Sequence, residues 1–550
     1  MVDPLNPLYI ELSNHGFFEI EIAESEVRCE CIILGNNIKL ICKLSECFPY
    51  ELPKMYIDEE SYAPIGPLPH MLSDYMICTF DTTTCIPNFL NPTQIIIDSF
   101  CQARLTIYEG IKKENTQDFF DEIDAYWKHA CQGVAMSVVT PTESVKIVQL
   151  YWDKYVYLAD SRAELDLLLS NSGIKKRYQK HYYKCIYLPL SIRISLPFPR
   201  TNKELYCMIQ SDVSVFEGYR EFLQKHFTKG VFVMTATPNE NGRCLQLWRH
   251  TPSKISVRGF RKGHVPAHVS YLYDGRQKPL VKFGVINLTQ SRLFYRGGDG
   301  LQTNITKCAT IGCGSIGSFI VEALAECGVA QFVLNDNDKL ASENIARHFC
   351  GHSYIGKSKV FAISDKLKKH NPNISTILFE ENGLQFIDKQ QNLLNDCDCI
   401  FIATAYIPLE YKIVELLNCS KITKPIVLVW VEPFLAAGHV LVMQKPQDIF
   451  SEFFDDTFVF NQKVIKNPED FTRKESGCQS TFVQYSALHL KRFIYTFLEH
   501  LLHKIFQKNS SGNYWITWCG NLSEIRNRGA IIEDRWVNAE NYSMHIERID

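Results

Sequence analysis

The stretch that decides the fold runs from Lys307 to Asp338 and reads KCATIGCGSIGSFIVEALAECGVAQFVLNDND. A short apolar run over 308–311 predicts a β-strand, and the amphipathic pattern after it predicts a helix that Gly328 ends. A second apolar run over 332–334 predicts another strand. This order of strand, turn, helix and strand is that of a dinucleotide-type βαβ unit.

The turn of this unit carries the glycine pattern Gly312-x-Gly314-x-x-Gly317, and the second strand is followed by Asp336. Glycines let the backbone approach a polyphosphate at the positive end of the helix. An acid at the end of the second strand can accept hydrogen bonds from ribose hydroxyls. The pattern is weak alone, but in this context it predicts a nucleotide site.

Composition sets the broad class of the protein. The chain has 550 residues, of which 46% are apolar and 22% charged, so we expect three or four ordinary globular domains. The net charge of -3 gives no sign of nucleic-acid or membrane binding. The N-terminus has no signal-peptide pattern, and the apolar run 425–443 is interrupted by Glu432-Pro433 and His439. We therefore expect a cytoplasmic protein in which this run forms buried strands.

The sequence holds 20 cysteines, none of them in a C-x-x-C spacing. The spacing argues against a zinc knuckle or ribbon, and no protein metal ligands are assigned. Without an export signal, so many cysteines fit a reducing compartment, where most should be buried small apolar residues.

Residues 1–135 are predicted to form a small α+β domain of meander strands followed by two helices, the second over 116–130 with Thr116 as its candidate N-cap. It contains the segment FPYELPKMYI at 48–57, then Pro69-His70, then Cys78 within Met-Ile-Cys-Thr. In this order the motifs resemble the ubiquitin-conjugating fold. The resemblance implies that Cys78 is the cysteine that accepts a thioester.

One position departs from that family, because His70 is not followed by the asparagine of its His-Pro-Asn motif. The amide that assists the final transfer is therefore missing. The alternative for this domain is a noncatalytic interaction module of the same shape in which Cys78 is merely buried.

Residues 136–300 are predicted to be mostly β or mixed, with one helix around 215–225, and we assign them only a linker or docking role. A basic run with interleaved tyrosines, 175–184, is interpreted as a solvated face rather than a nucleic-acid site.

Residues 301–550 continue the doubly wound α/β pattern that begins at the glycine turn. Asp338, Asn344-x-x-Arg347 and Gly356-x-x-Lys359 follow in order. Together with the glycine pattern they resemble the ThiF/MoeB and ubiquitin-activating superfamily. The resemblance implies ATP as the nucleotide, with Arg347 and Lys359 neutralising charge on the phosphates and Asn344 donating to one of them.

Magnesium is implied with ATP, and Asp338 is the candidate residue for contact with the ion, although a loop-capping role is an equal alternative. Related enzymes place an acid after the strand predicted at 400–404. Here that segment reads ATAYIP and holds no acid before Glu410.

A second candidate nucleophile, Cys478, lies ahead of an amphipathic helical pattern that runs to about residue 505. Thr481-x-x-Gln484 is predicted to be a capping box, which would put Cys478 at the positive end of the helix and favour its thiolate. Activating enzymes of the superfamily place their catalytic cysteine in such a loop. A buried cysteine is the alternative.

The whole chain resembles the fused activating and conjugating enzyme of bacterial CBASS anti-phage operons. The resemblance implies a protein substrate with a C-terminal glycine, a cGAS-like nucleotidyltransferase, that is joined to target protein amines. We also expect a homodimer, as is usual for this adenylating fold. The alternatives are a ThiF/MoeB-like sulfur-carrier adenylyltransferase with a binding-only N-terminal domain, and a noncatalytic scaffold. Cys78 separates the first two, since only a conjugating enzyme needs it.

Overall fold

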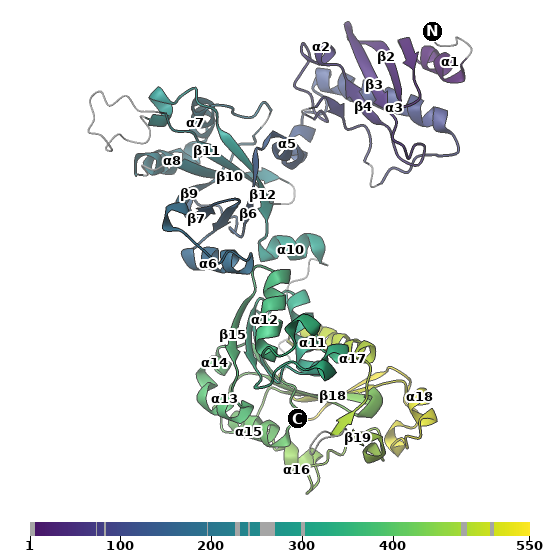
Figure 1. The fold of residues 1–550 in the computed structure, drawn as a ribbon, viewed down its shortest axis with the longest axis vertical. Coiled ribbons are helices and arrows are strands. Elements are labelled where there is room, and N and C mark those ends of the chain that lie inside the picture. Colours follow the sequence, from purple (N-terminus) through teal and green to yellow (C-terminus); the bar gives the residue numbers. More distant parts are fainter. Residues whose placement is uncertain are drawn as a thin grey trace. The chain divides into compact units, whose positions relative to one another are not determined.

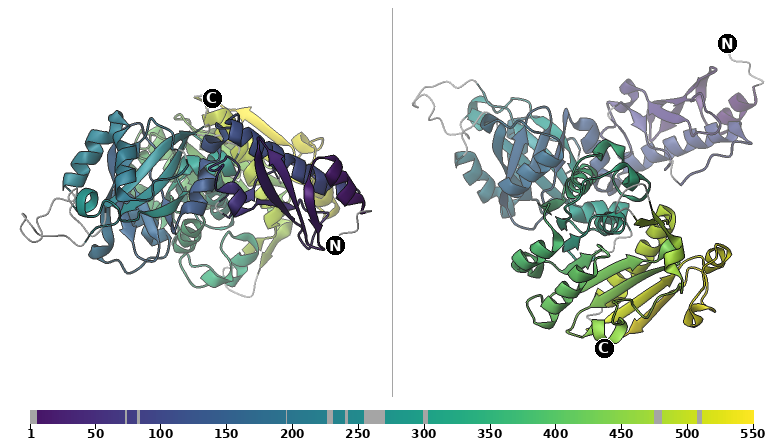
Figure 2. Two further views of the ribbon diagram at one scale, coloured as in Figure 1. Left: turned by 90° about the horizontal axis from the view of Figure 1, so that it is seen from above. Right: turned by 60° about the horizontal axis from the view of Figure 1, so that its bottom comes forward.

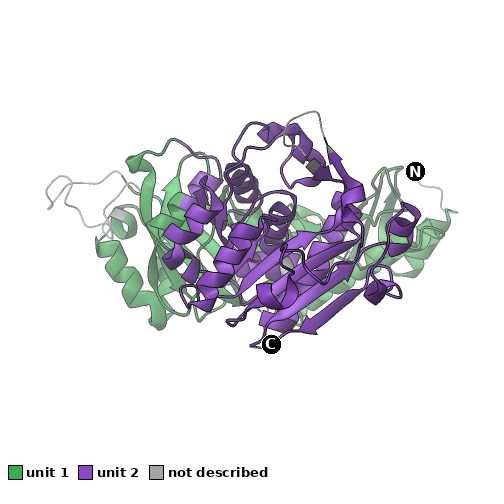
Figure 3. Ribbon diagram, turned by 90° about the horizontal axis from the view of Figure 1, so that it is seen from below, with its two compact units in different colours: residues 1–166, 176–287 green, residues 167–175, 288–550 purple. Residues whose placement is uncertain are grey.

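The computed structural model describes residues 6–72, 74–81, 84–194, 196–225, 231–239, 242–253, 270–298, 303–474, 481–506 and 511–550. The chain forms two compact units, residues 1–166 with 176–287 and residues 167–175 with 288–550 (Figure 3). The chain therefore passes between units three times, at 166/167, 175/176 and 287/288. Helix α6, Arg162–Asn171, includes the first of these boundaries.

Unit 1 begins with an antiparallel meander, as the sequence predicts. Its elements are α1 (Pro7–Asn14), β1 (Phe18–Ile22), β2 (Glu26–Ile33), β3 (Asn36–Lys43), β4 (Lys54–Ile57), α2 (Glu59–Tyr62), β5 (Met76–Ile77) and α3 (Pro92–Lys112). The five strands pair in sequence order (Figure 1). Alternate side chains of β2 and β3 are buried, and α3 contributes Phe100, Ala103 and Ile107 to the same core.

The next segment was predicted as one helix capped by Thr116, and that prediction is wrong. Two short helices form instead, α4 (Asp118–Asp121) and α5 (Ile123–Ala130), with Glu122 between them. The N-cap positions are Gln117 and Glu122, and the Thr116 hydroxyl donates backwards to the Lys113 carbonyl at 2.9 Å.

A closed seven-stranded barrel makes up the rest of unit 1. Its strands are β6 (Gly133–Ser137), β7 (Lys146–Trp152), β8 (Val156–Ala159), β9 (Tyr182–Pro189), β10 (Val231–Asn239), β11 (Gly242–His250) and β12 (Val281–Asn287). They pair around the barrel in the order β10-β11-β12-β6-β8-β7-β9, and the parallel pair β9–β10 closes the ring. The short helical elements here are η1 (Gln179–His181), α7 (Asn202–Gln210), α8 (Val213–Lys225) and η2 (Ser270–Asp274).

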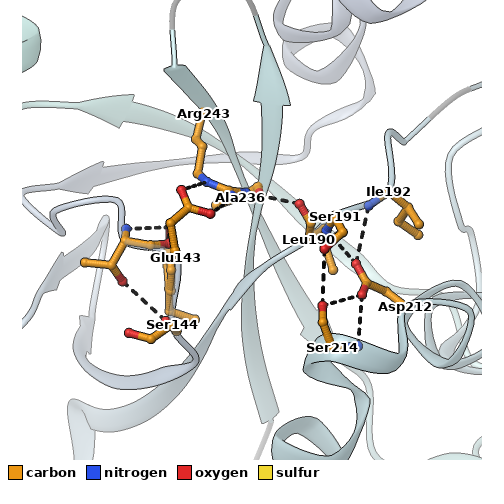
Figure 4. A network of polar contacts seen from close by, with 11 residues as sticks. Glu143, Ser144, Leu190, Ser191, Ile192, Asp212, Ser214, Ala236 and Arg243 are labelled. Carbon is orange, nitrogen blue, oxygen red and sulfur yellow. Dashed lines mark hydrogen bonds and ion pairs between the residues drawn. The ribbon is translucent and has the colours of Figure 1, made fainter.

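Charged side chains fix the loop that leaves β9 (Figure 4). Arg243 pairs with Glu143 and donates to the carbonyls of Leu190 and Ala236 at 3.1 and 2.8 Å. Asp212 is 4% exposed and accepts the main-chain N–H of Ser191 at 2.6 Å. The barrel strands also bury a core of their own, to which Leu150, Phe232 and Leu247 contribute.

Unit 2 contains an eight-stranded sheet in the order β15-β14-β13-β16-β17-β18-β21-β22. The strands are β13 (Lys307–Ile311), β14 (Gln331–Asn335), β15 (Ser375–Phe379), β16 (Cys399–Ile402), β17 (Ile426–Val431), β18 (Ala437–Met443), β21 (Tyr514–Cys519) and β22 (Met544–Arg548). The first five are mutually parallel and the remaining pairs are antiparallel. The sheet is seen from below in the right view of Figure 2.

Helices cover both faces of this sheet, so the predicted doubly wound fold is confirmed. Helices α11 (Ser315–Glu326), α12 (Lys359–His370) and α17 (Ala487–His500) bury apolar side chains in one core, and α13 (Gly383–Lys389), α14 (Gln391–Asn395) and α15 (Ile407–Asn418) in another (Figure 1). The remaining elements are α10 (Gln290–Gly297), η3 (Ser342–Arg347), η4 (His352–Tyr354), η5 (Pro433–Leu435), α16 (Ile449–Phe453), η6 (Pro468–Phe471), β19 (Thr472–Lys474), β20 (Thr481–Val483), η7 (Leu501–Phe506), α18 (Leu522–Asn527) and η8 (Asp534–Trp536).

The predicted capping box Thr481-x-x-Gln484 is wrong. Residues 481–483 form β20, which pairs with β19, and the Gln484 carbonyl accepts the Phe434 N–H at 2.8 Å. The helix begins only at Ala487, where the Ser486 hydroxyl accepts the Leu488 N–H at 3.1 Å. The extended conformation is preferred because residues 481–484 then hydrogen-bond β19 and the Phe434 N–H. A helix that started at Thr481 would leave those groups of β19 and Phe434 without these partners.

Two wider expectations concern the membrane and the thiols. Among the described residues, no helix combines the length and apolar character needed to cross a bilayer. The apolar run at 425–443 forms the buried strands β17 and β18, as predicted. Every cysteine in the described part of the chain is a free thiol.

Candidate active sites

The glycine turn lies at the carboxyl end of β13 and forms a cradle open on one side. Gly312 has φ +86°, and a Cβ there would lie 2.8 Å from the Ala403 carbonyl oxygen. A Cβ on Gly317 would lie 1.9 Å from the Gly312 oxygen, so only glycine fits. At Gly314, the residue that caps α11, nothing lies within 4 Å of an added Cβ. The open side faces the free N–H groups of a helix N-terminus, which suits a phosphate.

Asp336 holds this cradle in shape from the end of β14. Its carboxylate accepts the Cys313 N–H at 2.7 Å and the Asp338 N–H at 2.8 Å, and its side chain is 9% exposed. Burial raises the pKa of Asp336, opposed by the nearby Lys359 ammonium. Lys359 Nζ lies 2.7 Å from Asp338 and 3.9 Å from Asp336. The structure thus brings together the glycines, Asp336, Asp338 and Lys359.

A neutral imidazole, that of His348 at the end of the Asn344-x-x-Arg347 motif, also supports the cradle. His348 Nδ1 accepts the Cys350 N–H at 2.9 Å, so Nε2 carries the proton and donates to the Cys313 carbonyl at 2.9 Å. Burial lowers the pKa of His348, in agreement with this tautomer.

The other predicted phosphate-binding residues are engaged with protein atoms. Asn344 Oδ1 accepts the Ala341 N–H at 2.9 Å, which leaves the amide NH₂ as the group that could donate to a ligand. The Arg347 guanidinium donates to the Val483 carbonyl at 3.0 Å and lies 4.7 Å from the centre of the Tyr485 ring. Tyr485 in turn hydrogen-bonds Ser315, at the start of α11, at 2.6 Å. Arg347 therefore ties β20 to the nucleotide cradle.

A cavity of about 590 Å³ adjoins this contact. Arg347, Phe434, Tyr485, His489 and Arg528 are among the residues that line it. It lies beside β20, directly after the segment that contains Cys478. Cys478 itself lies outside the described residues, so its predicted place at a helix N-terminus is not seen. Its flanking strands are paired, with Lys474 opposite Thr481.

A dedicated magnesium site is not built by the described residues. They contain no group of three or more His, Cys, Asp or Glu side chains placed to hold a metal ion. Asp338 is 64% exposed and already paired with Lys359, and the carboxylate of Glu410 is buried, with its pKa raised to about 7 by burial. The residues therefore fit ATP but do not by themselves fit Mg²⁺.

The second candidate site surrounds Cys78 in unit 1. Cys78 follows β5, is half-buried, and donates its N–H to the His70 carbonyl at 2.8 Å. Burial raises the pKa of the Cys78 thiol, and the carboxylates of Glu122 and Asp74 add to the effect. The resting cysteine is therefore a thiol at neutral pH, exposed enough to react.

His70 contacts three side chains that the sequence did not single out, those of Asp118, Glu122 and Tyr126. His70 Nε2 lies 2.9 Å from Asp118, and Nδ1 lies 2.8 Å from Glu122. Tyr126 Oη donates to Glu122 at 2.6 Å and accepts the His70 N–H at 2.6 Å. Hydrogen bonding to Glu122 is the main reason that the pKa of His70 is raised to about 9. Asp118, Glu122 and Tyr126 stand four residues apart, a spacing that places side chains on one face of a helix. The spacing does not show that His70 lies against that face.

Fold and sites together define the class of protein. A glycine cradle with a buried Asp and Lys at the carboxyl ends of a doubly wound sheet is a nucleotide site of the adenylating kind. A meander followed by an accessible cysteine and long helix is the arrangement of the ubiquitin-conjugating fold.

Comparison with known families agrees with this division. The model of the ThiF family matches residues 291–487, and that of prokaryotic E2 family B matches residues 8–136. The chain therefore carries an N-terminal E2-like domain and a C-terminal ThiF domain, in support of a bacterial fusion of activating and conjugating modules.

Similarity to individual proteins is confined to short segments. The chain is 33% identical over 92 residues to ubiquitin-like modifier-activating enzyme 5 of Bombyx mori, covering 17% of this chain and 22% of that protein. The same enzyme of Caenorhabditis elegans is 38% identical over 66 residues, covering 12% and 16%. The tRNA threonylcarbamoyladenosine dehydratase of Haemophilus influenzae is 36% identical over 72 residues, covering 13% and 28%. The matches thus span less than a third of these relatives.

Among solved structures, a crystal structure of PaaA superposes with a TM-score of 0.30 at 17% identity, covering 44% of this chain and 64% of that one.

Proposed function

We propose that the protein activates the C-terminal glycine carboxylate of a partner protein with ATP, holds it as a thioester on Cys478, passes it to Cys78 and joins it to a target amine. The observation that carries the proposal is the cradle formed by the glycines, Asp336 and Lys359 on the same chain as an E2-like domain with an accessible Cys78.

The nucleotide site supplies positioning and charge. ATP contributes an adenylyl group, so that the partner's carboxylate becomes a mixed anhydride and pyrophosphate leaves. The N–H groups at the start of α11 and the Lys359 ammonium meet the phosphates, and Asp336 accepts from the ribose. Arg347 turns from the Val483 carbonyl to the phosphates or holds β20 while they bind. Since no metal-ligand group is found among the residues that the structure describes, the proposal has Mg²⁺ arrive with the nucleotide.

The two cysteines act in a fixed order. The Cys478 thiolate attacks the anhydride carbonyl, and AMP leaves. The Cys78 thiolate then attacks the new thioester, so that one C–S bond forms as the other breaks and the Cys478 thiolate is released. An amine finally displaces the Cys78 thiolate and forms the amide. Strand β20, which follows the segment with Cys478 in the sequence, contacts Arg347 through the Val483 carbonyl.

The finer assignments follow from the resemblance to the fused CBASS enzymes. The partner is a cGAS-like nucleotidyltransferase with a C-terminal glycine, the setting is anti-phage defence in the cytoplasm, and the enzyme is a homodimer. Relatives named ubiquitin-like modifier-activating enzymes support a protein substrate rather than a metabolite.

The test is ATP–pyrophosphate exchange with a glycine-ending partner protein. Exchange should need that partner, and Asp336→Ala or Arg347→Ala should remove most of it. Wild-type exchange in the Arg347 variant would refute the assignment. Sedimentation of a fully active monomer at micromolar concentration would refute the dimer.

A second candidate is adenylation without conjugation, as in a sulfur-carrier adenylyltransferase. The similarity to a bacterial tRNA threonylcarbamoyladenosine dehydratase favours it, because that relative is named for a reaction on tRNA and not for joining proteins. The two candidates differ in whether Cys78 becomes acylated during turnover.

A further inference from the structure

His70 is the residue through which the Cys78 loop is attached to the rest of unit 1. It has φ +59°, the left-handed region that a non-glycine side chain adopts only when its surroundings impose it. Its carbonyl accepts the Cys78 N–H at 2.8 Å, and its own N–H donates to Tyr126 at 2.6 Å. The carbonyl of His70 is thus bonded to Cys78, and its N–H is bonded to Tyr126 of α5.

The ring bridges two carboxylates, which settles its charge. Both nitrogens lie within 2.9 Å of a carboxylate oxygen, one of Asp118 and the other of Glu122. A carboxylate only accepts, so both nitrogens must donate and the ring is an imidazolium. A neutral ring would leave one of these contacts without a proton. The clamp therefore depends on the charge of His70 as well as on its shape.

Helix α5, which follows Glu122 and carries Tyr126, is anchored in the barrel. Tyr126 and Trp127 of α5 are buried with barrel side chains. The Trp127 Nε1–H donates to the Phe283 carbonyl of β12 at 3.0 Å, and its ring lies 4.4 Å from that of Trp248 in β11. Tyr126 therefore links the two regions directly: it is buried in the barrel core and it contacts His70 in the Cys78 loop.

We propose that the charged His70 is the positioning residue of the Cys78 site, and that the barrel fixes its place through Tyr126 and Trp127. The inference rests on the proposed function, because it concerns the transfer from Cys78 to an amine. It gives the barrel a part in that transfer beyond connecting two catalytic domains. It also names what holds the loop in a chain that lacks the asparagine after His70.

The charges of the cluster make the proposal testable by sign. Asp118, Glu122, Tyr126 and Cys78 face His70 or its contacts, and Asp74 acts on the cysteine from the loop itself. Glu122→Gln removes a negative charge near Cys78, while the Gln amide oxygen and Asp118 can still accept from both nitrogens of His70, so the Cys78 thiolate should be favoured. His70→Ala removes a positive charge and should disfavour it. A loop that simply came apart would shift both variants in the same direction.

The experiment uses the full chain with Cys478→Ser, so that acyl groups stay on Cys78. Alkylation of Cys78 by iodoacetamide at pH 7.5 is followed by mass spectrometry of its peptide. A synthetic peptide thioester ending in glycine then loads Cys78, and discharge to free lysine is timed. Asp124→Asn and His129→Ala, on the exposed side of α5, are the matched controls.

We expect Glu122→Gln to speed alkylation and His70→Ala to slow it, each by about threefold. Both should slow discharge to lysine by at least about tenfold, the cost of a displaced reacting group. Tyr126→Phe, which removes one hydroxyl, should slow discharge as well, and so should Trp127→Phe, which keeps a ring but loses the bond to Phe283. The controls should match the parent.

Either of two results overturns the inference. One is a shift of alkylation in the same direction for Glu122→Gln and His70→Ala, and the other is unchanged discharge in both. If the parent chain takes up no acyl group on Cys78 at all, the proposed conjugation fails instead, so the two failures are distinguishable.

Discussion

Replacement of Asp336 gives the sharpest test of the nucleotide cradle. In Asp336→Ala, the N–H groups of Cys313 and Asp338 lose the carboxylate that now accepts them at 2.7 and 2.8 Å. The Lys359 ammonium also loses one of its two acidic neighbours. The cradle should then lose the shape that brings its remaining N–H groups toward one phosphate.

The size of the effect follows from these two bonds. A hydrogen bond to a charged group contributes about 1.5–3 kcal/mol net, so the pair contributes about 3–6 kcal/mol to the order of the loop. Part of this loss weakens folding rather than binding. We therefore expect ATP affinity to fall by at least about 100-fold, or about 2.7 kcal/mol.

Asp336→Asn is the finer variant, because its amide keeps one acceptor but turns a donor toward the other N–H. Its loss should lie between those of wild type and Asp336→Ala. Calorimetric titration with ATP in the absence of a partner protein measures the affinities directly. Asp388→Ala, an exposed acid on α13, is the control. If Asp336→Ala binds ATP with an affinity within about threefold of wild type, the role given to the carboxylate is refuted. Its two hydrogen bonds predict a loss of affinity of at least about 100-fold.

Three further predictions follow from the same sites. Gly317→Ala puts a Cβ 1.9 Å from the Gly312 oxygen and should abolish ATP binding, whereas Gly351→Ala, with nothing within 4 Å, should not, and equal titrations of the two would contradict the steric argument. On non-reducing gels with ATP and the partner, Cys478→Ala should lose both thioesters while Cys78→Ala keeps the first and makes no product; a thiol-resistant product at the normal rate from Cys78→Ala would make the N-terminal domain a docking module. Because the pKa of His70 rises from 6.5 to about 9 on folding, its contacts with the two carboxylates should stabilise unit 1 fully below pH 6.5 and lose that effect as pH rises through 9. Hydrogen exchange at the Cys78 amide, corrected for the intrinsic rate, should therefore speed up between about pH 7 and 9.5. The increase should be smaller in His70→Gln.

The features that the sequence predicted correctly are those determined by contacts between residues close together in the chain. The glycine turn and Asp336 were found because a βαβ unit places them within about thirty residues of each other, as its fold requires. Strands β2 and β3 alternate buried and exposed positions, and α3 begins at a proline after Asn91, which accepts the Gln94 N–H. In each case the determining contact lies near in sequence.

The features that were missed depend on distant partners. Nothing near His70 shows that Asp118 and Glu122 will close on its ring, because those residues arrive through the packing of α5 on the barrel. The helix start was misplaced for a similar reason. Thr481 and Ser486 are both suitable caps, and only the pairing of β20 with β19 excludes the first.

The three passages of the chain between the units affect how the protein can be made. Residues 167–175 belong to unit 2, yet the ribosome synthesises them more than a hundred residues before the rest of that unit, which begins at 288. Asn171 can make its bonds to the carbonyls of Pro372 and Ile374 only after those residues emerge. The end of α6 must therefore wait through the synthesis of the whole barrel. A gene fragment that stops before residue 288 would leave this short segment with no partner to fold against.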